Sequence, residues 1–251
     1  MLSGGTARTY PRRRAFAREA GTARGYSADV TLDEIAIALA AHAPVRAELR
    51  GRHGAAVAMV LREASAGPEV LFIERAVHPG DPWSGHMAFP GGRMDPGDPD
   101  PRSAAERETL EEVGLDLRGA DCLGRLDDME GHNAAASQLV ISGYVYRFAA
   151  APALAPNHEV ATAFWFPLAE LHEPGRQTVY PLGRSGIRDL PGILVGEPDR
   201  HIVWGLTHRF LETFFRIVGR PLPHRYPADL MRQLEDLERL ASPAGDRATG
   251  R

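Results

Sequence analysis

The feature that most constrains the fold of this 251-residue chain is one stretch, Phe89 to Asp116, with the sequence FPGGRMDPGDPDPRSAAERETLEEVGLD. Its first half concentrates proline, glycine and aspartate, which is typical of a turn-rich loop. Its second half predicts a helix from about Ser103 to Val113, and Gly114 predicts where that helix ends. A stiff loop therefore leads directly into a helix that is rich in carboxylates.

Three of these carboxylates share one face of the predicted helix. At roughly 100° per residue, Glu111 and Glu112 lie about −60° and +40° from Glu108. Like charges at these spacings repel each other by a few tenths of a kcal/mol per pair, even when exposed. Leu110 and Val113 fall on the opposite side, where we expect both of them to anchor the helix to a sheet.

Two explanations account for such a negative face. Water and salt screen many charged helix faces, so the glutamates need no further partner. Alternatively, they hold a hard divalent cation, since Mg²⁺ prefers carboxylate oxygens and keeps part of its coordination shell for water and phosphate. The preceding loop favours the cation, because Gly91 and Gly92 permit unusual backbone turns and the prolines lower the entropy lost in holding a phosphate. We expect Arg107 to orient one carboxylate through a bidentate pair.

The whole stretch resembles the Nudix box, whose pattern is G-x5-E-x7-R-E-U-x-E-E-x-G-U, where U is an aliphatic residue. The matching positions are Gly92, Arg107-Glu108, Glu111-Glu112 and Gly114-Leu115. Three positions depart from the pattern. Asp98 stands in place of glutamate, eight residues rather than seven separate it from Arg107, and Thr109 takes an aliphatic position. The first two departures alter the loop, and they leave the role of the Asp98 carboxylate open.

This resemblance implies a metal-dependent pyrophosphohydrolase with Mg²⁺ or Mn²⁺ as its cofactor. The substrate would be a small nucleoside diphosphate linked to another group X, and water would attack one phosphorus of the pyrophosphate. The implied metal ligands are Glu108, Glu111 and Glu112, and the implied catalytic residues are Glu108, Glu111 and Arg107. One of the glutamates, or a carboxylate outside the box, would act as the general base. Glu159 and Glu130 are the outside candidates, and each is equally consistent with a surface acid.

The segment before the box is similar to the upstream signature of the coenzyme A pyrophosphatase branch of the family. LFIERAVHPGDPWSGHMAFPGG ends, as that signature does, in G-x3-F-P-G-G from Gly85 to Gly92. Coenzyme A or an acyl derivative is therefore the leading substrate, cleaved to 3′,5′-ADP and (acyl-)4′-phosphopantetheine. The basic residue expected to hold the 3′-phosphate falls at Asp81, in a loop one residue longer than the signature. Two alternatives stay open: hydrolysis of ADP-ribose or another nucleotide conjugate, and a nucleotide sensor without catalysis.

The same segment supplies the substrate-binding candidates, which are Arg75, Trp83, His86, Phe89, Gly91 and Gly92. An exposed aromatic ring in a loop suits base stacking, but Trp83 is equally suited to pack onto the core. His86 is placed to contact phosphate, although a lone histidine is more often structural. Arg75 would compensate for the cation absent at position 81, unless it only ends a strand.

The remaining sequence predicts one α/β (α+β) domain, a Nudix-type mixed sheet sandwiched between helices. A capping-box pair, Thr31 and Glu34, opens a helix in VTLDEIAIALAAH. Hydrophobic patterns predict a hairpin from two strands at 55–61 and 69–75. Further predicted strands are 138–148, 158–167, 176–182, 192–195 and 201–204, and further predicted helices are 205–219 and 227–241. The last two helices either pair subunits into a homodimer or cover the sheet.

We divide the chain into an Arg-rich disordered tail at 1–28, a Nudix domain with helical additions at 29–240 and a disordered tail at 241–251. The formal charge of −4 gives no field typical of a nucleic-acid partner. No apolar run approaches the ~20 residues of a membrane-spanning helix, so no membrane partner is expected. The one cysteine suits a reducing compartment, and we expect a cytoplasmic protein. An organellar transit peptide in the Arg-rich start is the alternative.

Overall fold

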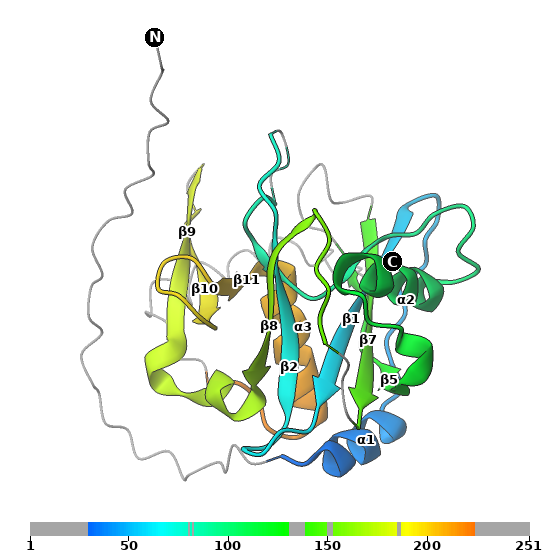
Figure 1. Ribbon diagram of the computed structural model, residues 1–251, viewed down its shortest axis with the longest axis horizontal. Helices are drawn as coiled ribbons and strands as arrows, with labels where there is room; N and C mark the ends of the chain where they lie inside the picture. The colour runs from blue at the N-terminus through cyan, green and yellow to red at the C-terminus, as the bar shows by residue number, and fades with distance from the viewer. Residues whose placement is uncertain are drawn as a thin grey trace, which may run out of the picture.

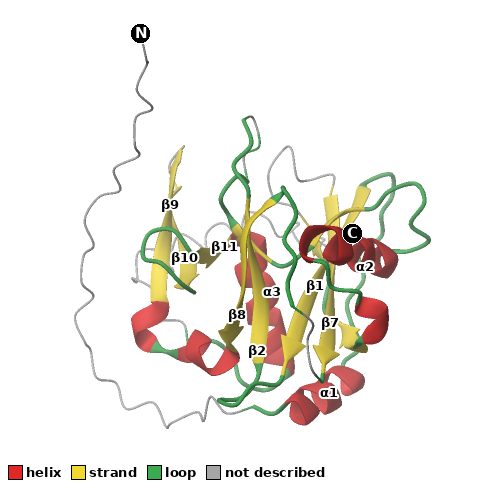
Figure 2. Ribbon diagram, viewed as in Figure 1, coloured by secondary structure: helices red, strands yellow, loops and turns green. Residues whose placement is uncertain are grey.

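The computed structural model describes residues 30–79, 81, 83–130, 139–149, 153–184 and 187–223. The helices are α1 (Leu32–Ala41), α2 (Pro101–Val113) and α3 (Gly205–Ile217), with 3₁₀ turns at Leu117–Gly119, Leu168–His172 and Pro174–Arg176 (Figure 2). The strands are β1 (His53–Arg62), β2 (Glu69–Arg75), β3 (Met87–Ala88), β4 (Gly91–Arg93), β5 (Asp121–Arg125), β6 (Met129–Glu130), β7 (Leu139–Phe148), β8 (Val160–Pro167), β9 (Gln177–Arg184), β10 (Ile187–Leu194) and β11 (Ile202–Trp204). Both predicted tails and the predicted helix at 227–241 lie outside the described residues.

The described strands form a mixed main sheet and a smaller antiparallel sheet (Figure 1). The main sheet has the order β3-β2-β1-β7-β5, with β4 paired to β1, β6 to β7 and β8 to β2. β1 and β7 run parallel along their full length, from His53 opposite Leu139 to Arg62 opposite Phe148. The predicted hairpin is confirmed, since β1 and β2 pair antiparallel through Leu61 and Val70. β9, β10 and β11 form the second sheet.

Residues of β1 alternate between two hydrophobic clusters, and this alternation defines the layers. Met59 and Leu61 face a cluster that includes residues of α1 and α3, whereas Ala58 and Val60 face the cluster that contains residues of α2. Helices therefore cover both faces of the main sheet, with α2 in front and α3 behind in Figure 1. The predicted mixed sheet between helices, in one domain, is confirmed. No helix in the described part of the chain has both the length and the apolar character needed to cross a membrane.

The helix ends agree closely with the sequence prediction. Thr31 caps α1, with its side chain accepting from the Glu34 N–H and the Glu34 carboxylate accepting from the Thr31 N–H. α2 ends at Gly114, which has φ 72° and donates its N–H to the Leu110 carbonyl. α2 begins two residues earlier than predicted, because Asp100 caps it and Pro101 occupies the first turn, where a missing N–H costs nothing.

One prediction about α2 is wrong. Leu110 does not anchor the helix, since its side chain is 43% exposed, although Val113 is fully buried as expected. The face against the sheet carries the small residues Ala104 and Ala105. Their size lets the helix lie close to β1, and this face also includes the buried Glu112.

Candidate active site

Gly91 and Gly92 allow β4 to lie against both β1 and α2. Ala56 of β1 is the register partner of Gly92. A Cβ atom on Gly92 would overlap the carboxylate of Glu108, and one on Gly91 would overlap the backbone of β1 at Ala56. Gly91 also has φ 149°, a conformation that other residues rarely adopt. Only glycine, which has no Cβ atom, therefore lets the backbone of β4 lie directly beside the glutamates at these two positions.

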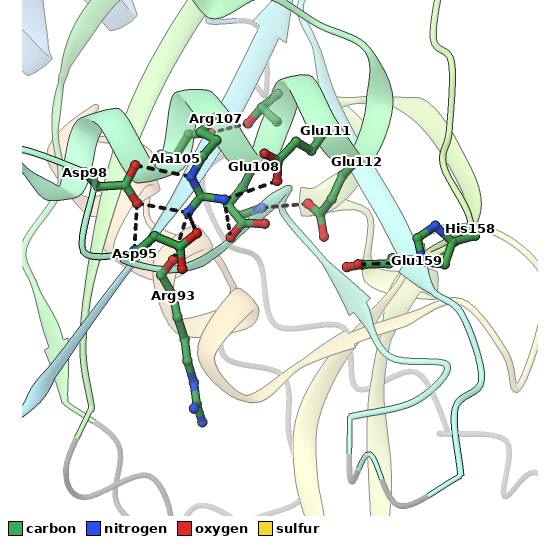
Figure 3. Close-up of polar contacts among 12 residues, drawn as sticks. Arg93, Asp95, Asp98, Ala105, Arg107, Glu108, Glu111, Glu112, His158 and Glu159 are labelled. Carbon is green, nitrogen blue, oxygen red and sulfur yellow. Dashed lines mark hydrogen bonds and ion pairs between the residues drawn. The ribbon is translucent and has the colours of Figure 1, made fainter.

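Arg107 links the loop to the acidic face of α2 (Figure 3). Its Nε and Nη2 atoms donate to the two Asp98 carboxylate oxygens at 3.2 and 2.9 Å. Its Nη1 atom donates to Glu108 at 3.0 Å and to Glu111 at 3.1 Å, and Nη2 also reaches the Arg93 carbonyl at 3.1 Å. The bidentate pair that the sequence predicted with a box glutamate is instead made with Asp98.

This ion pair explains the off-pattern acid. The Asp98 side chain is only 7% exposed, and the Arg107 guanidinium holds the pKa of its carboxyl below the usual range. Asp98 also accepts the Asp95 N–H at 2.8 Å, which closes the proline-rich turn. The sequence left its role open. Asp98 is an acid at the position where the box pattern has a glutamate. This match was the signal in the sequence that could have identified Asp98 as the partner of Arg107.

Glu112 is the most unusual carboxylate of the site. Its side chain is 2% exposed, and Oε2 accepts the Gly91 N–H at 2.8 Å. Burial raises the pKa of Glu112 to about 7, and the nearby charges of Glu108 and Glu159 act in the same direction. The Gly91 N–H and the charge of Arg75 act against that rise. An acid in this environment is poised to lose its proton when a cation arrives.

Glu108 and Glu159 complete the acidic side of the site. Burial raises the pKa of Glu108, while Arg107 opposes the rise and the charges of Glu111 and Glu159 add to it. Glu159 immediately precedes β8, and its carbonyl accepts the Ala76 N–H at 2.7 Å at the end of β2. In Figure 3 its side chain extends toward Glu112. Glu130, the other outside candidate, is paired with Arg52 at 2.9 Å.

The three box glutamates offer the donor set that Mg²⁺ or Mn²⁺ prefers, which is carboxylate oxygen. Within the described ranges, no group of three or more His, Cys, Asp or Glu side chains is already gathered closely enough to hold a metal ion. Arg107 occupies one oxygen each of Glu108 and Glu111, and Gly91 occupies one oxygen of Glu112. Burial disfavours the ionised form of Glu112, and a bound divalent cation would stabilise that form. The residues therefore fit such an ion chemically. The raised pKa values of both Glu108 and Glu112 agree with that fit.

The substrate-binding candidates lie in different environments. Arg75 lies at the end of β2 and pairs with Asp81 at 3.2 Å. Trp83 is 41% exposed in the loop that follows. Phe89 is 2% exposed and stacks on Phe72 at 5.4 Å, so the structure places its ring in the core. Gly91 and Gly92, which follow it, lie directly against Glu112 and Glu108.

His86 belongs to an aromatic cluster that joins the two sheets. Its ring lies edge-on to Trp204 at 4.8 Å and to Tyr180 at 5.7 Å, and those two rings stack at 4.1 Å. The Tyr180 hydroxyl is 3.3 Å from Nε2 of His86. Burial lowers the pKa of His86, which favours a neutral imidazole. The cluster therefore holds the start of β3 against the second sheet.

Comparison with known proteins gives the class to which this geometry belongs. The family model described as NUDIX domain matches residues 51–184, which is more than half of the chain. This chain belongs to the Nudix family, whose members hydrolyse phosphoanhydride bonds as pyrophosphatases and generally need a divalent metal such as Mg²⁺ or Mn²⁺.

Individual relatives cover different shares of the chain. The mitochondrial coenzyme A diphosphatase NUDT8 of Homo sapiens is 33% identical over 169 residues, covering 64% of this chain and 68% of its own length. An uncharacterized protein of Schizosaccharomyces pombe is 41% identical over 116 residues, covering 44% of this chain, which thus spans only 35% of that relative. A MutT/nudix family protein from Enterococcus faecalis is similar in structure, with TM-score 0.46 and 16% identity, covering 82% of this chain and 75% of its own.

Proposed function

We propose that this protein hydrolyses coenzyme A, or an acyl derivative of it, to 3′,5′-ADP and (acyl-)4′-phosphopantetheine. The observation that supports the diphosphatase chemistry best is the buried Glu112, tied to the bare Gly91 backbone and surrounded by Glu108 and Glu159. The choice of coenzyme A is supported by the LFIERAVHPGDPWSGHMAFPGG segment and by the similarity to a relative named as a coenzyme A diphosphatase.

In this proposal Glu108, Glu111 and Glu112 hold the divalent cation, which when bound supplies charge neutralisation for the diphosphate. Glu159 accepts the proton of the attacking water. The new bond joins the water oxygen to one phosphorus, the bridging phosphorus–oxygen bond breaks, and two phosphate monoesters leave. Arg107 fixes the orientation of Glu108 and Glu111, and Asp98 fixes Arg107 in turn. Gly91 and Gly92 let the diphosphate approach without side-chain interference.

A substrate panel tests this proposal. The purified protein is incubated with Mg²⁺ or Mn²⁺ and coenzyme A, acetyl-coenzyme A, dephospho-coenzyme A or ADP-ribose, and products are identified by mass spectrometry in H₂¹⁸O. We expect the highest kcat/KM for coenzyme A or its acetyl ester, with ¹⁸O in one monoester product. Preference for ADP-ribose would contradict the coenzyme A assignment. Turnover of none of these diphosphates would support a sensor that binds nucleotides without hydrolysis.

One observation favours the ADP-ribose alternative. Asp81 occupies the position at which the resemblance implies a cation for the 3′-phosphate, and its carboxylate is paired with Arg75. ADP-ribose has no 3′-phosphate, so the negative charge of Asp81 would not repel it. The comparison of coenzyme A with dephospho-coenzyme A in the same panel separates the two cases.

A further inference from the structure

The loop between Arg75 and His86 is fixed by its own polar contacts. The Arg75 N–H donates to the His86 carbonyl at 3.1 Å, and the Gly85 N–H donates back to the Arg75 carbonyl at 3.0 Å. The Ser84 hydroxyl donates to the His78 carbonyl at 2.9 Å and accepts the His78 N–H at 3.0 Å. These contacts close the loop at its base, beside the end of β2.

Asp81 makes the contacts that join this loop to the Arg75 side chain. One oxygen accepts the Trp83 N–H at 2.9 Å, and the other accepts from Nη2 of Arg75 at 3.2 Å. The Asp81 side chain is 19% exposed. Burial acts to raise its pKa, but the Trp83 N–H and the Arg75 guanidinium outweigh burial and lower it. Asp81 is therefore a fixed negative charge that holds one edge of the guanidinium.

Arg75 is left with a donor that has no partner. Its Nε atom is fully buried and makes no hydrogen bond to any described residue. Buried N–H groups are almost always paired in folded proteins, so the contacts of this guanidinium are incomplete. A ligand would contact its exposed part, because the Arg75 side chain as a whole is 31% exposed. Leu71 and Ile73 precede Arg75 on the same face of β2 and lie in the α2 cluster, so Arg75 points to the face that carries Glu112. Its charge acts on the carboxyl of Glu112, which agrees with that placement.

We propose that Asp81 is a positioning residue, which holds Arg75 so that the exposed part of its guanidinium is presented to an oxygen of the substrate's diphosphate. This inference rests on the proposed function and refines it. The aspartate acts through Arg75 on the group that every nucleoside diphosphate conjugate shares. In this role it does not select for or against a 3′-phosphate, so Asp81 would no longer favour ADP-ribose over coenzyme A. An Arg–carboxylate pair restrains the guanidinium rotation, and a restrained donor loses less entropy when a phosphate binds.

The competing role for Asp81 is simple repulsion of the 3′-phosphate, and two substrates distinguish the roles. The variants are Asp81→Asn, Arg75→Ala and the double variant, each assayed with coenzyme A and with dephospho-coenzyme A. Loss of an oriented charge-assisted hydrogen bond predicts that Asp81→Asn lowers kcat/KM about tenfold, and equally for both compounds. In the Arg75→Ala background the second substitution is expected to have no further effect.

A matched control lies at the other end of the same strand. Glu69 pairs with Arg62 at 2.7 Å, remote from the site, so Glu69→Gln should leave kcat/KM unchanged. Equal thermal midpoints for wild type, Asp81→Asn and Glu69→Gln would exclude a general loss of folding. Binding of ADP to the metal-free protein, followed by calorimetry, provides a readout that needs no turnover. We expect Asp81→Asn to weaken it by about tenfold as well.

Three results would overturn the inference: wild-type kinetics and ADP binding in Asp81→Asn, a gain in activity confined to coenzyme A, or a loss that persists without Arg75. Failure of the wild-type protein to hydrolyse either compound would overturn the proposed function instead. The ADP titration would then still test whether Asp81 acts through Arg75.

Discussion

Replacing Glu112 by glutamine keeps the size of the side chain and an oxygen acceptor for the Gly91 N–H, but it removes the charge that burial destabilises. The carboxyl group has a pKa near 4.5 in an unfolded chain and about 7 in the folded protein. At 1.36 kcal/mol per pH unit, this difference corresponds to roughly 3 kcal/mol. The folded state binds the proton more tightly than the unfolded state. The stability of the metal-free wild type therefore falls as pH rises from about 4.5 to about 7, and stays low above pH 7.

Urea unfolding in the presence of EDTA measures this effect. At pH 4.5 the Glu112→Gln variant should have the same free energy of unfolding as wild type, and at pH 8 it should be more stable by up to about 3 kcal/mol. Glu63→Gln, at an exposed position, provides the control and should show no such pH dependence. In Mg²⁺, the Glu112→Gln variant should lose about 10²–10³ in kcat/KM, the range for one preorganised electrostatic group. A variant that is less stable than wild type at pH 8 without metal would refute the reasoning.

Three further substitutions probe the surroundings of Glu112. Gly92→Ala inserts a methyl group into the space of the Glu108 carboxylate. We expect kcat to fall at least tenfold and the free energy of unfolding, measured by denaturation, to fall by roughly 1–3 kcal/mol. An unchanged kcat would contradict this packing. Asp98→Asn breaks the ion pair with Arg107, so we expect a destabilisation of roughly 1–3 kcal/mol at pH 7. Because the pKa of Asp98 is lowered in the folded protein, this difference should persist down to about pH 4 and be lost only as the pH falls through the lowered pKa. A pH-independent difference in urea unfolding would argue against that ion pair. Glu159→Gln should lower kcat without weakening Mn²⁺ binding measured by calorimetry, and wild-type kcat in this variant would exclude Glu159 as the base.

The sequence predicted the features that depend on local patterns. The capping box at Thr31, the hairpin of β1 and β2 and the end of α2 at Gly114 follow from turn and capping chemistry within a few residues. The motif positions of the box likewise placed Arg107 beside two of its glutamates. Short strands such as β3 and β6, with two residues each, have no hydrophobic pattern of their own and arise from pairing with neighbours.

The sequence failed where the environment of a side chain depends on distant residues. A helical wheel places Glu112 and Glu108 on one polar face, yet α2 is rotated so that Glu112 is buried and Leu110 is exposed. The cause is the alanine pair in the first turns of α2, together with the backbone of Gly91, which offers the buried carboxylate a donor from β4. The partner of Arg75 was also unpredictable, because it depends on a loop held by Ser84.

Calorimetric titration of the EDTA-treated protein with Mn²⁺ or Mg²⁺ tests the central claim most directly. At pH 6, below the pKa of Glu112, binding should release a proton, so the measured heat should depend on the ionisation enthalpy of the buffer. At pH 8.5 this dependence should largely disappear. The account predicts divalent binding at millimolar concentrations that is abolished when Glu108, Glu111 and Glu112 are all replaced by glutamine. Absence of binding in wild type, or undiminished binding in the triple variant, would contradict it.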